Sequence, residues 1–72
     1  MEPLEAALEV LAEEGGGPLH WTVIQDLALR RGYLDPFTQP DIRKNLVAAL
    51  SAAGKEGTLV RTDAGVYRLP RT

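Results

Sequence analysis

The side chains best suited to bind a charged ligand are concentrated in the second half of this 72-residue sequence. Arginine, lysine, asparagine and serine donate hydrogen bonds to phosphate oxygens or to base edges in complexes with nucleic acid. The candidate nucleic-acid contacts are Arg43, Lys44, Asn45, Ser51, Arg61 and Arg68. Arg43, Lys44 and Asn45 fall early in a helical segment, where recognition helices place the residues that reach the bases.

A second interpretation of the same residues stays open. Arg43, Lys44, Asn45 and Ser51 lie off the apolar stripe of their segment, and an ordinary solvated helix face has the same composition. Arg61 and Arg68 occur in short β-prone runs, where a charged side chain also keeps an edge strand soluble.

The charges are distributed unevenly along the chain. The formal net charge is −2, which by itself disfavours a nucleic-acid partner. Residues 1–36 hold two basic and seven acidic side chains, whereas residues 37–72 hold six basic and three acidic ones. This asymmetry favours a second half that faces a polyanion.

No residue pattern indicates catalysis. His20, the one histidine, has no nucleophile near it in a known motif, and Gly15-Gly16-Gly17 follows a helical segment instead of opening one, so it is a poor phosphate cradle. The absence of cysteine argues against disulfides and a typical zinc site. We expect no enzymatic activity, no metal and no cofactor, with Trp21 in the core and His20 at the surface.

Two helical segments are expected in the first half. Apolar residues at helical spacing begin the chain, and the glycines at 15–17 end the segment; the stripe comprises Leu4, Ala7, Leu8, Leu11 and Ala12. For the second helix, Thr22 is a suitable N-cap with Gln25 at capping-box spacing, and Gly32 ends it.

A third helix and a hairpin are expected in the second half. Thr38 or Gln39 begins the helix with Pro40 in its first turn, and it runs to about Ala53 before Gly54 and Gly57. The connector before it is apolar, so Leu34 or Phe37 should pack against the core. Residues 58–62 and 66–69 then form a β-hairpin around a loop at 63–65, and Leu19-His20 can add a third strand.

These elements predict a single α+β, mainly α domain over residues 1–72, a winged helix-turn-helix with three helices and a C-terminal two- or three-stranded β-wing. So small a domain must be held by packing alone. The expected core residues are Leu8, Leu11, Ile24, Leu27, Leu46, Leu50, Tyr67 and Leu69.

The arrangement resembles one known family. The residues that carry the resemblance are the alanine-rich first helix, Pro18 to Trp21, Ile24, the connector ending at Phe37 to Pro40, Leu59, and Gly65 to Leu69. Together they are similar to the HARE-type helix-turn-helix domain, which occurs fused to restriction and DNA-modification enzymes, in chromatin-associated proteins and in the delta subunit of bacterial RNA polymerase. The resemblance implies work on or near DNA.

We therefore expect a DNA-binding or transcription-associated module whose third helix and wing contact duplex DNA. The alternative is an adaptor that docks on transcription or DNA-processing proteins without touching DNA, through the acidic residues Glu5, Glu9 and Glu13. A homodimer is a third possibility. The acidic beginning of the chain and the lack of a long apolar run predict a cytoplasmic protein with no membrane contact.

Overall fold

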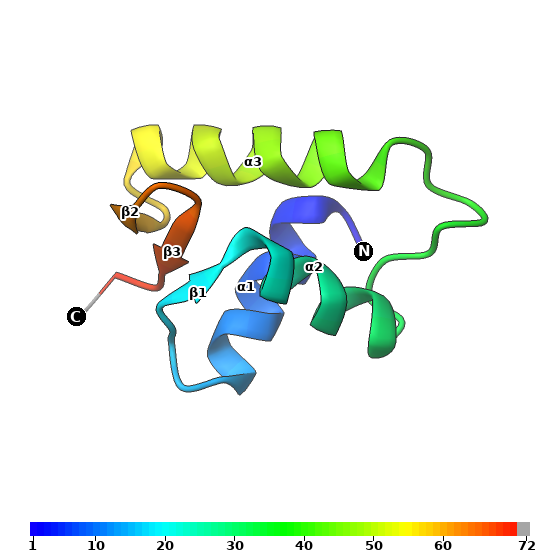
Figure 1. Ribbon diagram of the computed structural model, residues 1–72, viewed down its shortest axis with the longest axis horizontal. Coiled ribbons are helices and arrows are strands. Elements are labelled where there is room, and N and C mark those ends of the chain that lie inside the picture. The colour runs from blue at the N-terminus through cyan, green and yellow to red at the C-terminus, as the bar shows by residue number, and fades with distance from the viewer. Residues whose placement is uncertain (71–72) are drawn as a thin grey trace.

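The computed structural model describes residues 1–70 and has the winged-helix order of elements. The elements are α1 (Pro3–Glu13), β1 (Leu19–His20), α2 (Trp21–Arg30), α3 (Ile42–Glu56), β2 (Val60–Asp63) and β3 (Val66–Arg68). In Figure 1, α3 lies across α1 and α2, and the hairpin of β2 and β3 lies under its C-terminal end. The α+β, mainly helical fold class is confirmed. None of the three helices described is both long and apolar enough to cross a membrane.

The buried side of α1 differs from the expected stripe. Ala6, Ala7, Val10 and Leu11 are buried, while Leu4 and Leu8 are only half-buried and Ala12 is exposed. The helix is rotated towards Ala6 and Val10 because it contacts both of the other helices, α2 through a second cluster of apolar residues. Pro3 stands in the first turn, as expected.

The expected starts of α2 and α3 were wrong. The N-cap of α2 is His20, whose imidazole accepts a hydrogen bond from the Thr22 backbone N–H at 3.3 Å, so Thr22 lies inside the helix. The third helix begins at Ile42, after Asp41 in the left-handed region with φ of 50°. Pro40 precedes it, because the turn of residues 35–39 is closed by its own hydrogen bonds.

The C-terminal end of α3 also lies beyond the prediction. The helix continues through Gly54 to Glu56 and ends at Gly57, which has a φ of 84°. A glycine within a helix costs roughly 1 kcal/mol relative to alanine. A Cβ at Gly54 would lie 3.5 Å from the Tyr67 ring, an ordinary van der Waals distance, so the contact with Tyr67 does not require glycine there.

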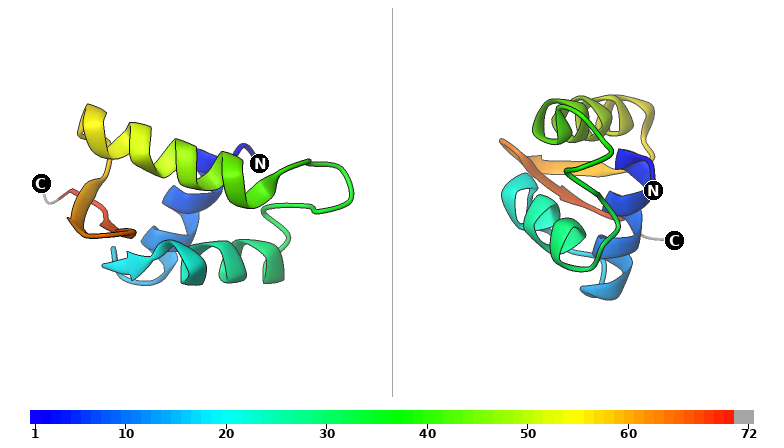
Figure 2. Two further views of the ribbon diagram at one scale, coloured as in Figure 1. Left: turned by 45° about the horizontal axis from the view of Figure 1, so that its top comes forward. Right: turned by 90° about the vertical axis from the view of Figure 1, so that its right-hand side faces the viewer.

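The wing is a three-stranded antiparallel sheet in the order β1-β3-β2, which confirms Leu19-His20 as a strand. Leu19 pairs with Tyr67 on one side of β3, and Arg61 pairs with Tyr67 on the other. The strands are shorter than the predicted runs, and a two-residue turn, Ala64-Gly65, joins β2 to β3. Figure 2 shows this short hairpin closing one end of the molecule between α3 and the start of α2.

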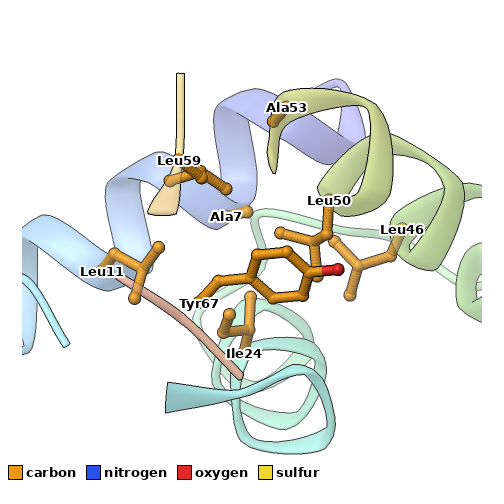
Figure 3. Packing of buried hydrophobic residues seen from close by; sticks show 8 residues of the cluster. All are labelled: Ala7, Leu11, Ile24, Leu46, Leu50, Ala53, Leu59 and Tyr67. Atoms are coloured by element: carbon orange, nitrogen blue, oxygen red, sulfur yellow. The ribbon is translucent and has the colours of Figure 1, made fainter. Parts of the chain in front are cut away.

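The core consists of two clusters. The main one is drawn in Figure 3, where the Tyr67 ring points among side chains of all three helices. Its members are Ala7, Leu11, Ile24, Leu46, Leu50, Ala53, Leu59 and Tyr67. Of the expected core, Leu8, Leu27 and Leu69 are only half-buried and pack against the two clusters from outside. They lie at the rims of their elements, where a domain this small still exposes side chains to water.

The connector between α2 and α3 is a protruding loop at the end opposite the wing (Figure 2). Either Leu34 or Phe37 was predicted to pack against the core. Leu34 does so, in the second cluster with 2% exposure, whereas Phe37 is 96% exposed. The Asp35 carboxylate accepts a hydrogen bond from the Phe37 N–H at 2.9 Å. Gln39 ties the loop to the start of α1 by donating to the Met1 carbonyl at 2.8 Å.

Candidate nucleic-acid interface

One side of α3 is not covered by the rest of the fold. Leu46, Leu50 and Ala53 face the core. The residue after each of the two leucines, Val47 and Ser51, lies about a third of a turn around the helix and faces solvent between α3, the start of α2 and the wing. Two adjoining shallow hollows lie there, of about 670 and 490 Å³, and both are lined by Trp21, Val47 and Ser51. We call this surface the α3–wing groove; its lining residues are Trp21, Asp41, Arg43, Lys44, Val47, Ala48, Ser51, Gly54, Lys55, Arg61, Gly65 and Tyr67.

The floor of the groove is apolar and aromatic. Trp21 is half-buried and packs against the main core cluster, yet it also lines both hollows. Val47 is 39% exposed and lines both hollows, so it adds an aliphatic side chain to the floor. The Arg43 guanidinium lies over the Trp21 ring, 5.5 Å from the ring centroid, in a cation–π contact.

The wing holds Trp21 in place. The Trp21 backbone N–H donates to the Gly65 carbonyl at 2.8 Å, which ties the hairpin turn to the start of α2. Gly65 has a φ of 71°, and a Cβ at this position would lie 2.9 Å from Trp21 Cδ1 and 3.0 Å from His20 Nε2. The close approach therefore requires glycine, and it fixes one edge of the indole ring against the wing.

The rim of the groove is cationic. Arg43 and Lys44 lie on the first turn of α3, Lys55 lies on its last turn, and Arg61 projects from β2 beside Gly54. Within residues 1–70, none of these four cations belongs to an ion pair with N···O of 4.0 Å or less. Among the residues that the structure describes, Asp41, at the N-terminal end of α3, is the one carboxylate that lines the two hollows.

At the C-terminal ends of α1 and α2, by contrast, the arginines are paired with carboxylates. Arg31 bridges the end of α1, with N···O distances of 2.8 Å to Glu13 and 2.9 Å to Glu14. The hydrogen bond to Glu14 is the main reason that the pKa of the Arg31 guanidinium is raised, and the negative charges of Glu13 and Glu14 add to it. Arg30 pairs with Asp26 one turn earlier on α2, at 2.9 Å.

The groove brings together four of the six candidate contacts: Arg43, Lys44, Ser51 and Arg61. Asn45 lies on another side of α3, and its side-chain amide donates to the Pro40 carbonyl at 3.0 Å, beside the start of α1. Arg68 lies near the glycines 15–17, on a different side of the sheet from Arg61, and donates to the Leu69 carbonyl at 3.0 Å. Neighbouring residues on a strand point to opposite faces, and Arg61 shares its face with Tyr67, so it cannot share one with Arg68.

Among the groove residues that sequence reasoning did not name as contacts, the most important are Trp21, Val47 and Lys55. Val47 carried a signal, since it is an apolar residue off the predicted stripe, between Arg43 and Ser51 at four-residue spacing. Lys55 lay beyond the predicted end of α3. Trp21 was predicted to lie in the core; it does pack against the core, but it also lines the groove.

His20 is exposed, as expected, and is committed to the local structure. Its Nδ1 accepts from the Thr22 backbone N–H and lies 2.8 Å from the Thr22 hydroxyl oxygen. The imidazole thus satisfies one of the free N–H groups at the start of α2.

Comparison with known proteins identifies no relative: no protein family, no curated protein and no solved structure matches this chain.

Proposed function

We propose that this domain is a DNA-binding winged helix whose contacts come from the α3–wing groove. The observation that carries the proposal is the gathering of Arg43, Lys44, Lys55 and Arg61 around one groove without carboxylate partners among the residues described. Unpaired cations on one face bind phosphates with release of condensed counterions, which is the main source of affinity for DNA.

The cations have distinct positions in this proposal. Arg43 and Lys44, at the start of α3, reach the strand that the helix faces, and Ser51 donates a hydrogen bond in the middle of the groove. Arg61 contacts a phosphate from the wing, which is too short to extend far along the duplex. Asn45 and Arg68 do not line the groove, so they are not part of the proposed site. That they contact DNA remains an untested prediction from the sequence.

The family assignment belongs to the same proposal. The order of helices and strands supports a winged helix, and the segments from Pro18 to Trp21 and from Gly65 to Leu69 support the HARE-type member of that class. A role in transcription or DNA processing would follow from it.

We also propose that the domain acts by binding and not by catalysis. The support is the use of its only imidazole, since His20 Nδ1 already accepts a hydrogen bond from the Thr22 backbone N–H and thereby caps α2.

The decisive experiment is a salt titration of binding to a random-sequence DNA duplex, followed by fluorescence anisotropy. The logarithm of the affinity should fall linearly with the logarithm of the salt concentration, and Lys44→Ala or Arg61→Ala should each flatten the slope by about one unit. The matched control is Arg30→Ala, which removes a cation that already has a partner and should leave the slope unchanged. Absence of sub-millimolar binding at about 50 mM salt would overturn the proposal.

One observation favours the adaptor as a second candidate. Glu5 and Glu9 are exposed on α1, and neither forms an ion pair among residues 1–70. Glu13, the third member of the predicted acidic face, is occupied by Arg31 and Tyr33. If DNA binding fails, reversing the charge of Glu5 and Glu9 should weaken binding to a basic protein partner, while reversal of Lys44 should not.

A further inference from the structure

We propose that the α3–wing groove holds an unpaired DNA base stacked on Trp21, so that the domain prefers a duplex with an unpaired nucleotide to a fully paired one. The inference rests on the proposed function and adds the form of DNA that the groove selects.

The shape and lining of the groove carry the first step. A helix that reads an intact duplex meets base edges, because the faces of the bases are covered by their neighbours in the stack. The α3–wing groove instead offers a recessed aromatic ring, flanked by the aliphatic Val47 and Ala48. A ring in a hollow has little use against base edges, but it accepts the flat face of a base that has left the stack.

The charges carry the second step. Arg43 and Lys44 stand at one end of the groove and Lys55 and Arg61 at the other, with Trp21 lining both halves. Lys44 and Lys55 are eleven residues apart on α3, which corresponds to roughly 16 Å along the helix axis. A strand lying along the groove can therefore place phosphates on both sides of the base that stacks on Trp21. A cationic groove that tracks the backbone, combined with an aromatic platform, is how proteins bind single-stranded nucleic acid.

In the absence of DNA, the exposed face of the Trp21 ring is covered by Arg43. Its guanidinium covers the indole face at 5.5 Å from the centroid. Base stacking is stronger than an exposed cation–π contact, so an incoming base displaces the guanidinium. The released Arg43 is then free to pair with the phosphate next to that base.

The clamp from the wing completes the site. The hydrogen bond from Trp21 to the Gly65 carbonyl and the close approach of Gly65 hold one edge of the indole. A ring fixed in this way loses little freedom when a base stacks on it, which favours binding. His20 is tilted by 37° against Trp21, with ring centroids 5.8 Å apart, and lies on the same short segment as the platform.

The test compares three DNA probes of one sequence: a full duplex, the duplex with a single unpaired thymine, and the single strand. Trp21 is the only tryptophan in the chain, so its fluorescence reports on the site directly. We expect the duplex with the unpaired base to bind about tenfold more tightly than the full duplex. We also expect it to quench Trp21 fluorescence, whereas the full duplex leaves the emission nearly unchanged.

Two variants separate stacking from folding. Trp21→Phe keeps an aromatic ring in the core with less stacking area, and should lower the preference for the unpaired base several-fold. Ser51→Leu fills the middle of the groove with an aliphatic side chain from an exposed position and should bring the ratio of the two affinities to about one. The matched control is Phe37→Leu, which removes an exposed aromatic ring that does not line the groove and should leave the ratio unchanged.

The outcomes distinguish this inference from the proposed function. Salt-dependent binding to the full duplex, with equal affinities for the first two probes and no quenching, would overturn the inference and leave the proposed function standing. Quenching and tight binding with the unpaired base alone would support the inference and restrict the proposed function to distorted DNA. Failure of all three probes to bind at about 50 mM salt would overturn both.

Discussion

Two regions of this molecule use arginine in opposite ways. At the edge between α1 and α2, Arg31 forms ion pairs with Glu13 and Glu14 at the C-terminal end of α1, and Arg30 forms one with Asp26. In the α3–wing groove, Arg43 and Arg61 have no carboxylate partner among residues 1–70, and the Arg43 guanidinium lies over an indole ring instead. The difference shows that pairing, not the number of charges, separates a cation that joins helices from one that is left for a ligand. We call the first region the paired edge.

The paired edge also determines how the acidic first half of the chain behaves. The carboxylates of Glu13 and Glu14 lie at the end of α1, where they oppose the helix dipole, and Arg31 compensates for them. The Tyr33 hydroxyl donates a hydrogen bond to the Glu13 carboxylate. Part of the negative charge counted in the sequence is therefore neutralised locally, and the net charge of −2 understates how basic the groove is.

The largest effect should come from comparing two consecutive residues of α3, one facing the core and one facing the groove. Leu46→Ala removes a fully buried side chain from the main core cluster and should cost about 2–5 kcal/mol of the free energy of unfolding. Val47→Ala removes one that is 39% exposed in the groove and should cost about 0.5 kcal/mol or less. Denaturant unfolding of both variants is the measurement. Equal costs would mean that the groove side of α3 serves the core, and would break the comparison.

A smaller effect should come from the glycine that clamps the wing to the groove. Gly65→Ala places a methyl group against Trp21 and His20 at a positive φ, and should destabilise the fold by about 2–3 kcal/mol. Gly57→Ala is the matched control, since it has a φ of 84° with no atom within 4 Å of the added Cβ, and should cost only about 1 kcal/mol. Thermal unfolding and Trp21 emission report the two changes. If Gly65→Ala costs no more than the control, the wing does not fix the indole.

The paired edge predicts an ordering of two arginine variants. Arg31→Ala breaks two ion pairs between helices and should lower the unfolding midpoint more than Arg30→Ala, which breaks one exposed pair within α2. Added salt should narrow the difference, because it screens exposed ion pairs. Thermal denaturation at low and high salt measures both. A larger effect of Arg30→Ala would show that the pairs between helices contribute nothing.

The smallest effect is a titration. The hydrogen bond to Glu13 is the main cause that raises the pKa of the Tyr33 phenol above its ordinary value of 10, with partial desolvation next. Because the folded state favours the neutral phenol, this contribution to stability is complete below pH 10 and disappears as the pH rises through the raised pKa. Glu13→Gln should lower the pKa of Tyr33 in an ultraviolet absorbance titration. Tyr33→Phe is the control, since it should remove the shifted phenol from the titration curve.

Much of the architecture was predictable because it depends on local signals. Pro3 and the glycines at 15–17 bound α1, alternating β-branched residues around Gly65 give the hairpin, and the stripe of Leu46, Leu50 and Ala53 gives α3 its buried side. The starts of α2 and α3 were not predictable in the same way. His20 is an uncommon N-cap, and the hydrogen bonds of the loop at residues 35–39 delay α3 beyond Pro40.

The sequence by itself determined the composition of the groove more than its position: the basic second half, Arg43, Lys44 and Ser51 off the apolar stripe, and Arg61 in a β-prone run. Only the tertiary structure decided which of these meet. The pleat of the sheet separates Arg61 from Arg68, and the helical turn takes Asn45 away from Arg43. Tertiary structure also places Trp21 in the groove. The hydrogen bond from Trp21 to Gly65 ties the start of α2 to a turn 44 residues later in the chain. Contacts between residues so far apart in the sequence depend on how the elements pack, so the spacing of residues along the chain does not predict them.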